Sequence, residues 1–145
     1  MNFMWADTLE AAERAHLLRL VLWGGASLVV GTALVVLLRV GRQRSSLLDQ
    51  FGLQNAAWGT LEVVLGGLGL RSLSVRDLAG ATRLDRMVWS SIGLEVGVVL
   101  VGITLVVVGW RVARRPALIG AGLGVVVQGA ALAILDLALA AQISR

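Results

Sequence analysis

Four apolar runs, each long enough to cross a lipid bilayer as a helix, constrain what this chain can fold into. They cover residues 20–38, 51–70, 87–110 and 118–141. About 18 or more apolar residues, rising ~1.5 Å each, span the ~30 Å hydrocarbon layer. The second run is the weakest, because Gln54, Asn55, Glu62 and five glycines dilute its hydropathy. We therefore expect one all-α domain over residues 1–145, an integral membrane four-helix transmembrane bundle.

Composition supports this class and excludes several kinds of site. Hydrophobic residues make up 57% of the chain and charged residues 15%, whereas soluble domains average ~25% charged residues. There is no cysteine, so disulfides, thiolate metal sites and cysteine nucleophiles are excluded. Four spans and their connections use nearly the whole sequence, so we expect the protein to act in or at the membrane.

Polar side chains inside the apolar runs are the candidates for function. They are Gln54, Asn55, Trp58, Glu62, Glu95, Gln128 and Asp136. Lipid cannot satisfy their hydrogen bonds, so the helix faces that carry them should point at one another. An ionised carboxylate at mid-bilayer costs at least ~2.5 kcal/mol, so each acid needs a cation, a hydrogen-bond donor or a proton.

Position along the spans divides these residues into two groups. Glu62 and Gln128 lie near the middle of their runs. Glu62 has no cation at its depth, so we expect it to be protonated or hydrogen-bonded to Gln128, Asn55 or Ser27. These mid-membrane residues are the better place to look for function.

Glu95 and Asp136 lie toward one membrane boundary, where arginines are in reach. The arginines available there for ion pairs or lipid headgroups are Arg19, Arg71, Arg83 and Arg86. We expect Asp136 to pair with Arg19 or Arg86, and these acids to be structural.

Capping patterns predict where helices begin. Residues 74–77, Ser-Val-Arg-Asp, fit the capping box of a helix start, and predict a short interfacial helix between the second and third spans. Residues 7–10 repeat the pattern and predict a helix that continues into the first span or bends near Gly24. Pro116 can occupy the first turn of the fourth helix without loss of a hydrogen bond.

The arginines indicate an orientation. All thirteen basic residues are arginine, and the compact connections at residues 39–44 and 111–115 are rich in them. Basic short loops favour the cytoplasmic side, which places both termini outside. The connection at residues 71–86 opposes this, since it holds four arginines of its own.

Enzymatic chemistry has little support. His16 is the one histidine, and a metal site needs several ligands in close spacing. No phosphate-binding loop or nucleophile elbow is present. We expect no catalytic residue and no metal, and His16 to be solvated at the membrane boundary, with a pigment metal as the alternative. Lipid headgroups account for the arginines, so nucleic-acid binding is not expected.

Three interpretations of the buried acids remain open. They can form structural hydrogen bonds that fix helix register. They can line a proton or cation path, since Glu62, Glu95 and Asp136 form a half-membrane series. Alternatively, the polar faces form a cleft for a lipid, quinone or pigment, or a docking face for a larger complex.

Short motifs in the spans resemble a family of small bacterial four-helix membrane proteins, a domain of unknown function. Its last helix carries Q-G-x-x-L-x-x-x-D, which Gln128, Gly129, Leu132 and Asp136 match in full. The second-helix pattern Q-x-N-x-x-W is matched in part, by Asn55 and Trp58, and Glu95 stands for the acid of the third helix. Ser27 replaces the asparagine of the first helix, and Glu62 is a further departure. The resemblance implies the four-helix topology and a shared polar core, and it carries no activity.

These observations together predict a non-enzymatic, multi-pass protein of the bacterial inner membrane, with both termini periplasmic. We expect an accessory or assembly subunit that packs against other membrane proteins, for example in a respiratory or photosynthetic complex, or a holder of a lipid-like ligand. The alternative is a small proton-coupled or cation transporter that uses the intramembrane carboxylates.

Overall fold

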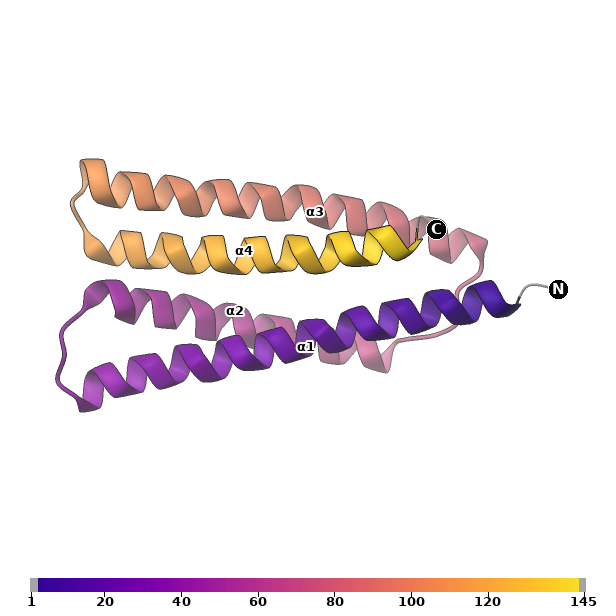
Figure 1. The fold of residues 1–145 in the computed structure, drawn as a ribbon, viewed down its shortest axis with the longest axis horizontal. Helices are drawn as coiled ribbons and strands as arrows, with labels where there is room; N and C mark the ends of the chain where they lie inside the picture. The colour runs from indigo at the N-terminus through magenta and orange to yellow at the C-terminus, as the bar shows by residue number, and fades with distance from the viewer. Residues whose placement is uncertain (1–2, 144–145) are drawn as a thin grey trace.

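The computed structural model describes residues 3–143, and over that range the chain is a bundle of four long helices without strands (Figure 1). The helices are α1 (Phe3–Val40), α2 (Ser46–Arg71), α3 (Leu78–Val107) and α4 (Pro116–Ile143). A π-helical turn, η1 (Val108–Val112), extends α3. The prediction of an all-α, four-helix chain is confirmed.

The helix starts differ in part from the sequence prediction. α1 already begins at Phe3 and runs without interruption through Gly24, so the predicted start at residues 7–10 is wrong. Asp77 caps α3, its carboxylate accepting a hydrogen bond from the Gly80 amide at 2.7 Å. α3 then continues unbroken from Leu78, so a separate short helix between the second and third spans is not confirmed.

The α1–α2 and α3–α4 loops are short and close two helical hairpins. They lie at the end of the bundle opposite the α2–α3 connection (Figure 1). Ser45 caps α2 by accepting a hydrogen bond from the Leu48 amide at 3.4 Å. Pro116 occupies the first turn of α4, as predicted, since that position has no helical partner for an amide. Figure 1 shows the α1–α2 and α3–α4 hairpins closing at one end of the bundle, and the N-terminus, the C-terminus and the α2–α3 connection at the other.

The packing of the two hairpins is uneven. α1 packs along α2, and α3 packs along α4. α4 joins the hairpins, because it also packs against α2 and, less extensively, against α1. α2 and α3 make almost no contact with each other along their described lengths. One side of the bundle, between α2 and α3, is therefore left open.

Glycines let α1 and α2 approach closely. A Cβ atom at Gly59 would meet the Gly24 carbonyl oxygen and lie 2.5 Å from the Leu28 amide nitrogen. At Gly31, a Cβ would lie 2.5 Å from the Ala56 amide nitrogen. Helix interfaces of this kind are made by small residues, which gain dispersion contacts over a large backbone area.

The distribution of side chains is the inverse of that in a soluble bundle. Large apolar residues such as Leu22, Val64 and Leu94 are more than half exposed. Polar residues are buried instead, namely Glu13, Ser27, Asn55, Glu62, Glu95 and Gln128. A small apolar core lies at the end of the bundle that holds the termini, around Leu84 and Leu139.

Three of the helical segments in the described range are long and apolar enough to cross a membrane. They are Met4–Val40, Leu78–Val112 and Pro116–Ile143. α2 does not reach this hydropathy, because its polar residues and glycines dilute the apolar ones, as its sequence indicated. Its buried face holds Asn55, Glu62 and three glycines, whereas its outward face, with Leu53 and Leu68, is apolar.

We predict that Gly59→Ala destabilises the bundle by about 1–3 kcal/mol, because the new methyl group forces α1 and α2 apart. Gly67→Ala on the same helix is the control, since no described atom lies within 4 Å of a Cβ there. That substitution should be neutral or stabilising by up to ~1 kcal/mol. Thermal unfolding in detergent, followed by circular dichroism, measures both. Equal melting temperatures for the two variants would contradict the packing described here.

Candidate functional site

A closed polar network centred on Gln128 joins three helices. The Gln128 side chain is fully buried, with 0% exposure. Its amide nitrogen donates to Ser27 Oγ at 3.0 Å and to Asn55 Oδ1 at 2.7 Å. Its amide oxygen accepts from Trp23 Nε1 at 2.7 Å. These four residues, hereafter the Gln128 network, come from α1, α2 and α4.

Every member of the network has at least one hydrogen-bond partner within it. Both amide protons of Gln128 are used, and its oxygen has a donor. Asn55 in turn donates from Nδ2 to the Phe51 carbonyl at 2.8 Å. A fully satisfied buried network fixes the register of the helices that contribute to it. The sequence pointed to Gln128 as a functional residue, but its geometry is that of a structural one.

Glu62 does not take part in this network. Its side chain is 2% exposed, and within residues 3–143 neither carboxyl oxygen has a hydrogen-bond partner. The predicted hydrogen bond from Glu62 to Gln128, Asn55 or Ser27 is therefore wrong. Ser27 and Asn55 bond to Gln128 instead, and Glu62 lines a separate cavity.

Glu62 lines a cavity of about 460 Å³ in the half of the bundle that holds the termini. The cavity lies where α2 and α3 are apart, with α1 and α4 behind it. Seven titratable side chains line it, namely Glu13 and His16 of α1, Glu62 of α2, Arg76 of the α2–α3 connection, Arg83 and Glu95 of α3, and Asp136 of α4. Trp58 and several leucines, including Leu20, Leu65 and Leu132, form the walls.

Asp136 pairs with His16, which the sequence predicted to be solvated. His16 Nε2 lies 3.3 Å from Asp136 Oδ1, and the two side chains are 12% and 13% exposed. The predicted ion pair of Asp136 with Arg19 or Arg86 is wrong, since both arginines are exposed and neither forms an ion pair in the described structure. A long arginine side chain reaches water or headgroups more cheaply than it is buried. The expectation that His16 is solvated is also wrong.

Glu95 completes a cluster at this level of the cavity. It is 8% exposed, and its carboxyl lies close enough to that of Asp136 for the two to interact across the α3–α4 interface. Glu95 Oε2 and His16 Nδ1 have no hydrogen-bond partner within the described range. Three titratable groups from three helices thus meet here. No arrangement of three or more potential metal ligands is found among residues 3–143.

Arg76 closes the end of the cavity that lies nearest the termini. Its guanidinium donates two hydrogen bonds to the Glu13 carboxylate, from Nε at 2.7 Å and from Nη2 at 2.5 Å. This bidentate pair ties the α2–α3 connection to α1. Hydrogen bonding to Glu13 raises the pKa of Arg76 above its ordinary value, so the guanidinium stays charged throughout the neutral pH range. Sequence patterns gave no signal for this pair, which joins residues 63 positions apart.

The remaining predicted site residues have other positions. Gln54 packs against Gly124 of α4 and belongs neither to the network nor to the cavity. Arg71 is exposed at the end of α2. Arg83 is exposed as well and lines the cavity at its mouth. Trp23, a member of the Gln128 network, was missed as a site residue, although it stands four residues before Ser27 on the same helix face.

We predict that Gln128→Leu destabilises the bundle by about 1–3 kcal/mol, because Trp23, Ser27 and Asn55 lose a buried partner. Gln142→Leu is the matched control on the same helix, since exposed Gln142 bonds to the Ala138 carbonyl of its own helix. Its effect should stay within about 0.5 kcal/mol. Denaturant titration in detergent compares the two. A similar loss of stability in both variants would show that the network does not hold the helices.

Comparison with known proteins identifies a family without adding an activity. A search of the curated proteins gives no match, and neither does a search of the solved structures. A scan against protein families matches a single family of unknown function over residues 19–137. That region includes the whole Gln128 network and Glu62, Glu95 and Asp136 of the cavity, and His16 lies just before it. The chain therefore belongs to the family of unknown function DUF6992.

Proposed function

We propose that the protein is a non-enzymatic integral membrane protein whose four helices all cross the bilayer, and whose cavity holds a lipid-like ligand. The observation that carries the proposal is the 460 Å³ cavity on the open side of the bundle, with an unpartnered Glu62 inside it.

Membrane embedding is supported by the distribution of side chains, with apolar residues exposed and polar residues buried. Exposed leucines and valines cover the outside of the helices, including α2, whose buried face is polar. Burial of apolar surface drives association with the hydrocarbon layer at roughly 25 cal/mol per Å². α2 crosses the membrane in this proposal because its outward residues, such as Leu61 and Val64, meet lipid while Asn55 and Glu62 face the bundle.

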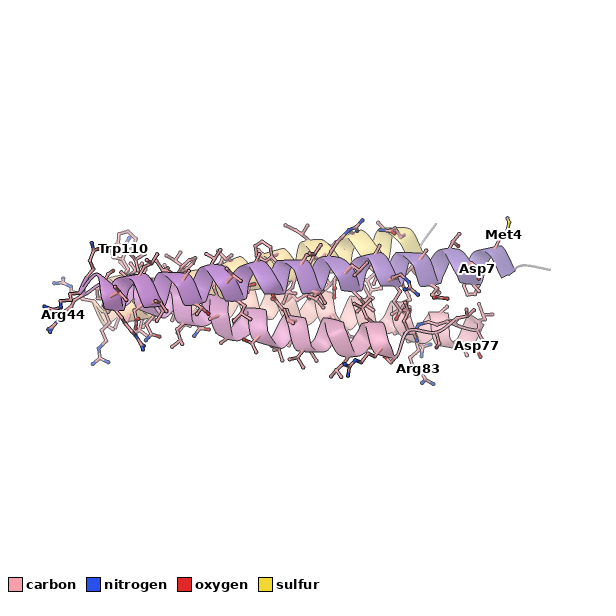
Figure 2. All side chains as sticks on the ribbon, turned by 90° about the horizontal axis from the view of Figure 1, so that it is seen from below. Met4, Asp7, Arg44, Asp77, Arg83 and Trp110 are labelled. Atoms are coloured by element: carbon pink, nitrogen blue, oxygen red, sulfur yellow. The ribbon has the colours of Figure 1, made fainter. Side chains whose placement is uncertain are left out.

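The charge at the two ends supports an orientation with both termini outside. The end that holds the two hairpin loops carries six arginines, in residues 39–44 and 111–115, and the acid Asp49. Figure 2 shows Arg44 and Trp110 at this end, and Asp7, Asp77 and Arg83 at the other. Basic short loops stay on the cytoplasmic side. In a bacterial inner membrane, the termini and the α2–α3 connection would then be periplasmic.

Backbone conformation in these loops adds to the argument. Arg42 and Arg114 each adopt a left-handed conformation, with φ of 52° and 48°. A residue with a Cβ atom pays roughly 1–2 kcal/mol there, and glycine does not. An arginine kept at that cost in both loops supports a role for its charge, such as contact with anionic headgroups.

Ligand binding is supported by the size, lining and opening of the cavity. Binding sites for small molecules have volumes of roughly 300–1,000 Å³, mostly apolar walls and a few polar groups. Here leucines form the walls, and Glu62, Glu95 and Ser91 supply the polar groups. The rim includes Leu61, Leu65 and Met87, which are 47%, 53% and 66% exposed. In a bilayer this rim would face the acyl chains, so a lipid-like molecule could reach the cavity sideways.

We predict that the protein purified in a mild detergent retains a bound amphiphile that native mass spectrometry detects. Ser91→Phe should lose it, because the phenyl ring fills the cavity that Ser91 lines. Ser90→Phe is the matched control, since the neighbouring Ser90 is exposed and points away. Absence of any bound molecule from the wild-type protein, or equal retention by the two variants, would contradict the proposal.

An accessory or assembly subunit of a larger membrane complex, respiratory or photosynthetic, is compatible with the same fold. The exposed apolar faces of α1 and α3, with Leu22 and Leu94, would suit packing against other membrane proteins. A stoichiometric partner chain in the same mild-detergent preparation would support this role. In that case the rim of the cavity should be covered by the partner.

Proton-coupled or cation transport is the second candidate, favoured by the three carboxyl groups Glu62, Glu95 and Asp136 that line one cavity. Buried ionisable groups in membrane helices mark ion and proton paths. We predict that, if the protein transports, Glu62→Gln abolishes flux driven by a pH gradient in proteoliposomes, because the amide cannot exchange a proton. Asp49→Asn, at the far end of the bundle, should leave the flux unchanged. Undiminished flux in the Glu62 variant would remove this candidate.

A further inference from the structure

We infer that the ligand of the cavity is a lipophilic organic cation, an ammonium or similar group that lies beside Glu62 and Glu95, with its apolar body against Trp58. This inference rests on the proposed function, in which the cavity holds a lipid-like ligand, and names the chemical class of that ligand. The inference depends on the charges, the unpartnered atoms and the opening of the cavity.

The interior of the cavity is acidic. Glu62, Glu95 and Asp136 line it, and the one basic group at their level is His16, which is already paired with Asp136. The two arginines in the lining do not neutralise the interior. Arg76 is held by Glu13, and Arg83 is exposed, twelve residues before Glu95 on α3, or about 18 Å along the helix. An anionic headgroup would therefore find no free cation to pair with in the interior of the described structure.

The unpartnered atoms in the interior are mainly acceptors. Both oxygens of Glu62 and Oε2 of Glu95 have no hydrogen-bond partner in residues 3–143, although the two side chains are 2% and 8% exposed. Buried carboxyl groups need compensation by charge or by donors. The protein does not provide it within the described structure, so the ligand is the natural source. A positively charged group satisfies several carboxyl oxygens at once without directional hydrogen bonds.

The walls suit the apolar part of such a ligand. Trp58 lines the cavity on α2, one helical turn from Glu62, and an indole ring attracts organic cations through its negative face. Leucines of all four helices complete the walls, namely Leu17, Leu61, Leu84 and Leu132 among others. The opening between α2 and α3, at Leu65 and Met87, faces outward. A lipophilic cation dissolved in the bilayer could enter there without crossing a polar barrier.

Binding should exchange a proton for the cation. A carboxyl group buried without a cation is held in its neutral form, because the ionised form would be left without compensation. When the cation R₄N⁺ binds, the O–H bond of the Glu62 carboxyl breaks, the carboxylate forms an ion pair with R₄N⁺, and the proton leaves to water. Charge is balanced, and no other reactant is needed. Affinity should therefore rise with pH, and one proton should appear per cation bound.

Equilibrium dialysis of the full-length protein in detergent tests the inference, with tetraphenylphosphonium as the cationic probe. Triphenylphosphine oxide, of similar shape but neutral, is the control ligand. We expect saturable binding of the cation and at least ~10-fold weaker binding to Glu62→Gln, which lacks the ionisable group. Asp7→Asn removes an exposed acid outside the cavity and should not change affinity.

The outcomes separate this inference from the proposed function. Stronger binding of the neutral probe than of the cation would overturn the inference and leave a ligand-holding cavity in place. Binding of neither probe, together with no amphiphile retained on purification, would overturn both. If the Glu62 variant fails to fold, proton release from the wild-type protein, followed with a pH indicator in weak buffer, decides the question. Cation binding without proton release and without pH dependence would contradict the inference.

Discussion

The hydrogen bonds of Gln128 hold three of the four helices together, and the rest of the structure depends on them. A buried amide without partners is costly, so Gln128 of α4 bonds to Trp23, Ser27 and Asn55 on α1 and α2. Glycines at the α1–α2 interface allow this approach, because side chains there would collide with backbone. α4 is thereby fixed against the α1–α2 hairpin, and α3 follows as its partner in the second hairpin.

This arrangement produces the cavity. α4 can fill only one side of the space beside the first hairpin, and α3 packs along α4 rather than along α2. The gap between α2 and α3 lies at the level where Glu62, Glu95 and Asp136 face inward. The same fold therefore contains a hydrogen-bonded polar network and an acidic cavity with unpartnered carboxyl oxygens in the described range. On α2, Asn55 of the network and Glu62 of the cavity lie about two turns apart. The network is suited to stability and the cavity to binding.

The sequence divided these polar residues by their depth in the spans, whereas the structure divides them by whether their side chains have hydrogen-bond partners. Glu62 and Gln128 are predicted at a similar depth, but within residues 3–143 only Gln128 has partners. Its amide can both donate and accept, and it bonds to Trp23, Ser27 and Asn55. Asp136 lies near a boundary with arginines in sequence reach, yet it pairs with His16. α1 extends beyond the predicted span toward Phe3, and this extension brings His16 onto the face that meets α4.

The sequence by itself determined that the chain is all-α, that each of its four helices contains one apolar run, and that Asn55, Glu62, Glu95, Gln128 and Asp136 face the interior. Hydropathy and helical periodicity suffice for this, since they are local properties of each segment. Only the tertiary structure decided which interior residues meet: Gln128 with Trp23, His16 with Asp136, and Glu13 with Arg76. Such pairs depend on the rotation and axial offset of each helix against its neighbours. The rotation and offset of each helix are set by close packing at glycines over the whole interface. They therefore cannot be predicted from the sequence of one segment alone.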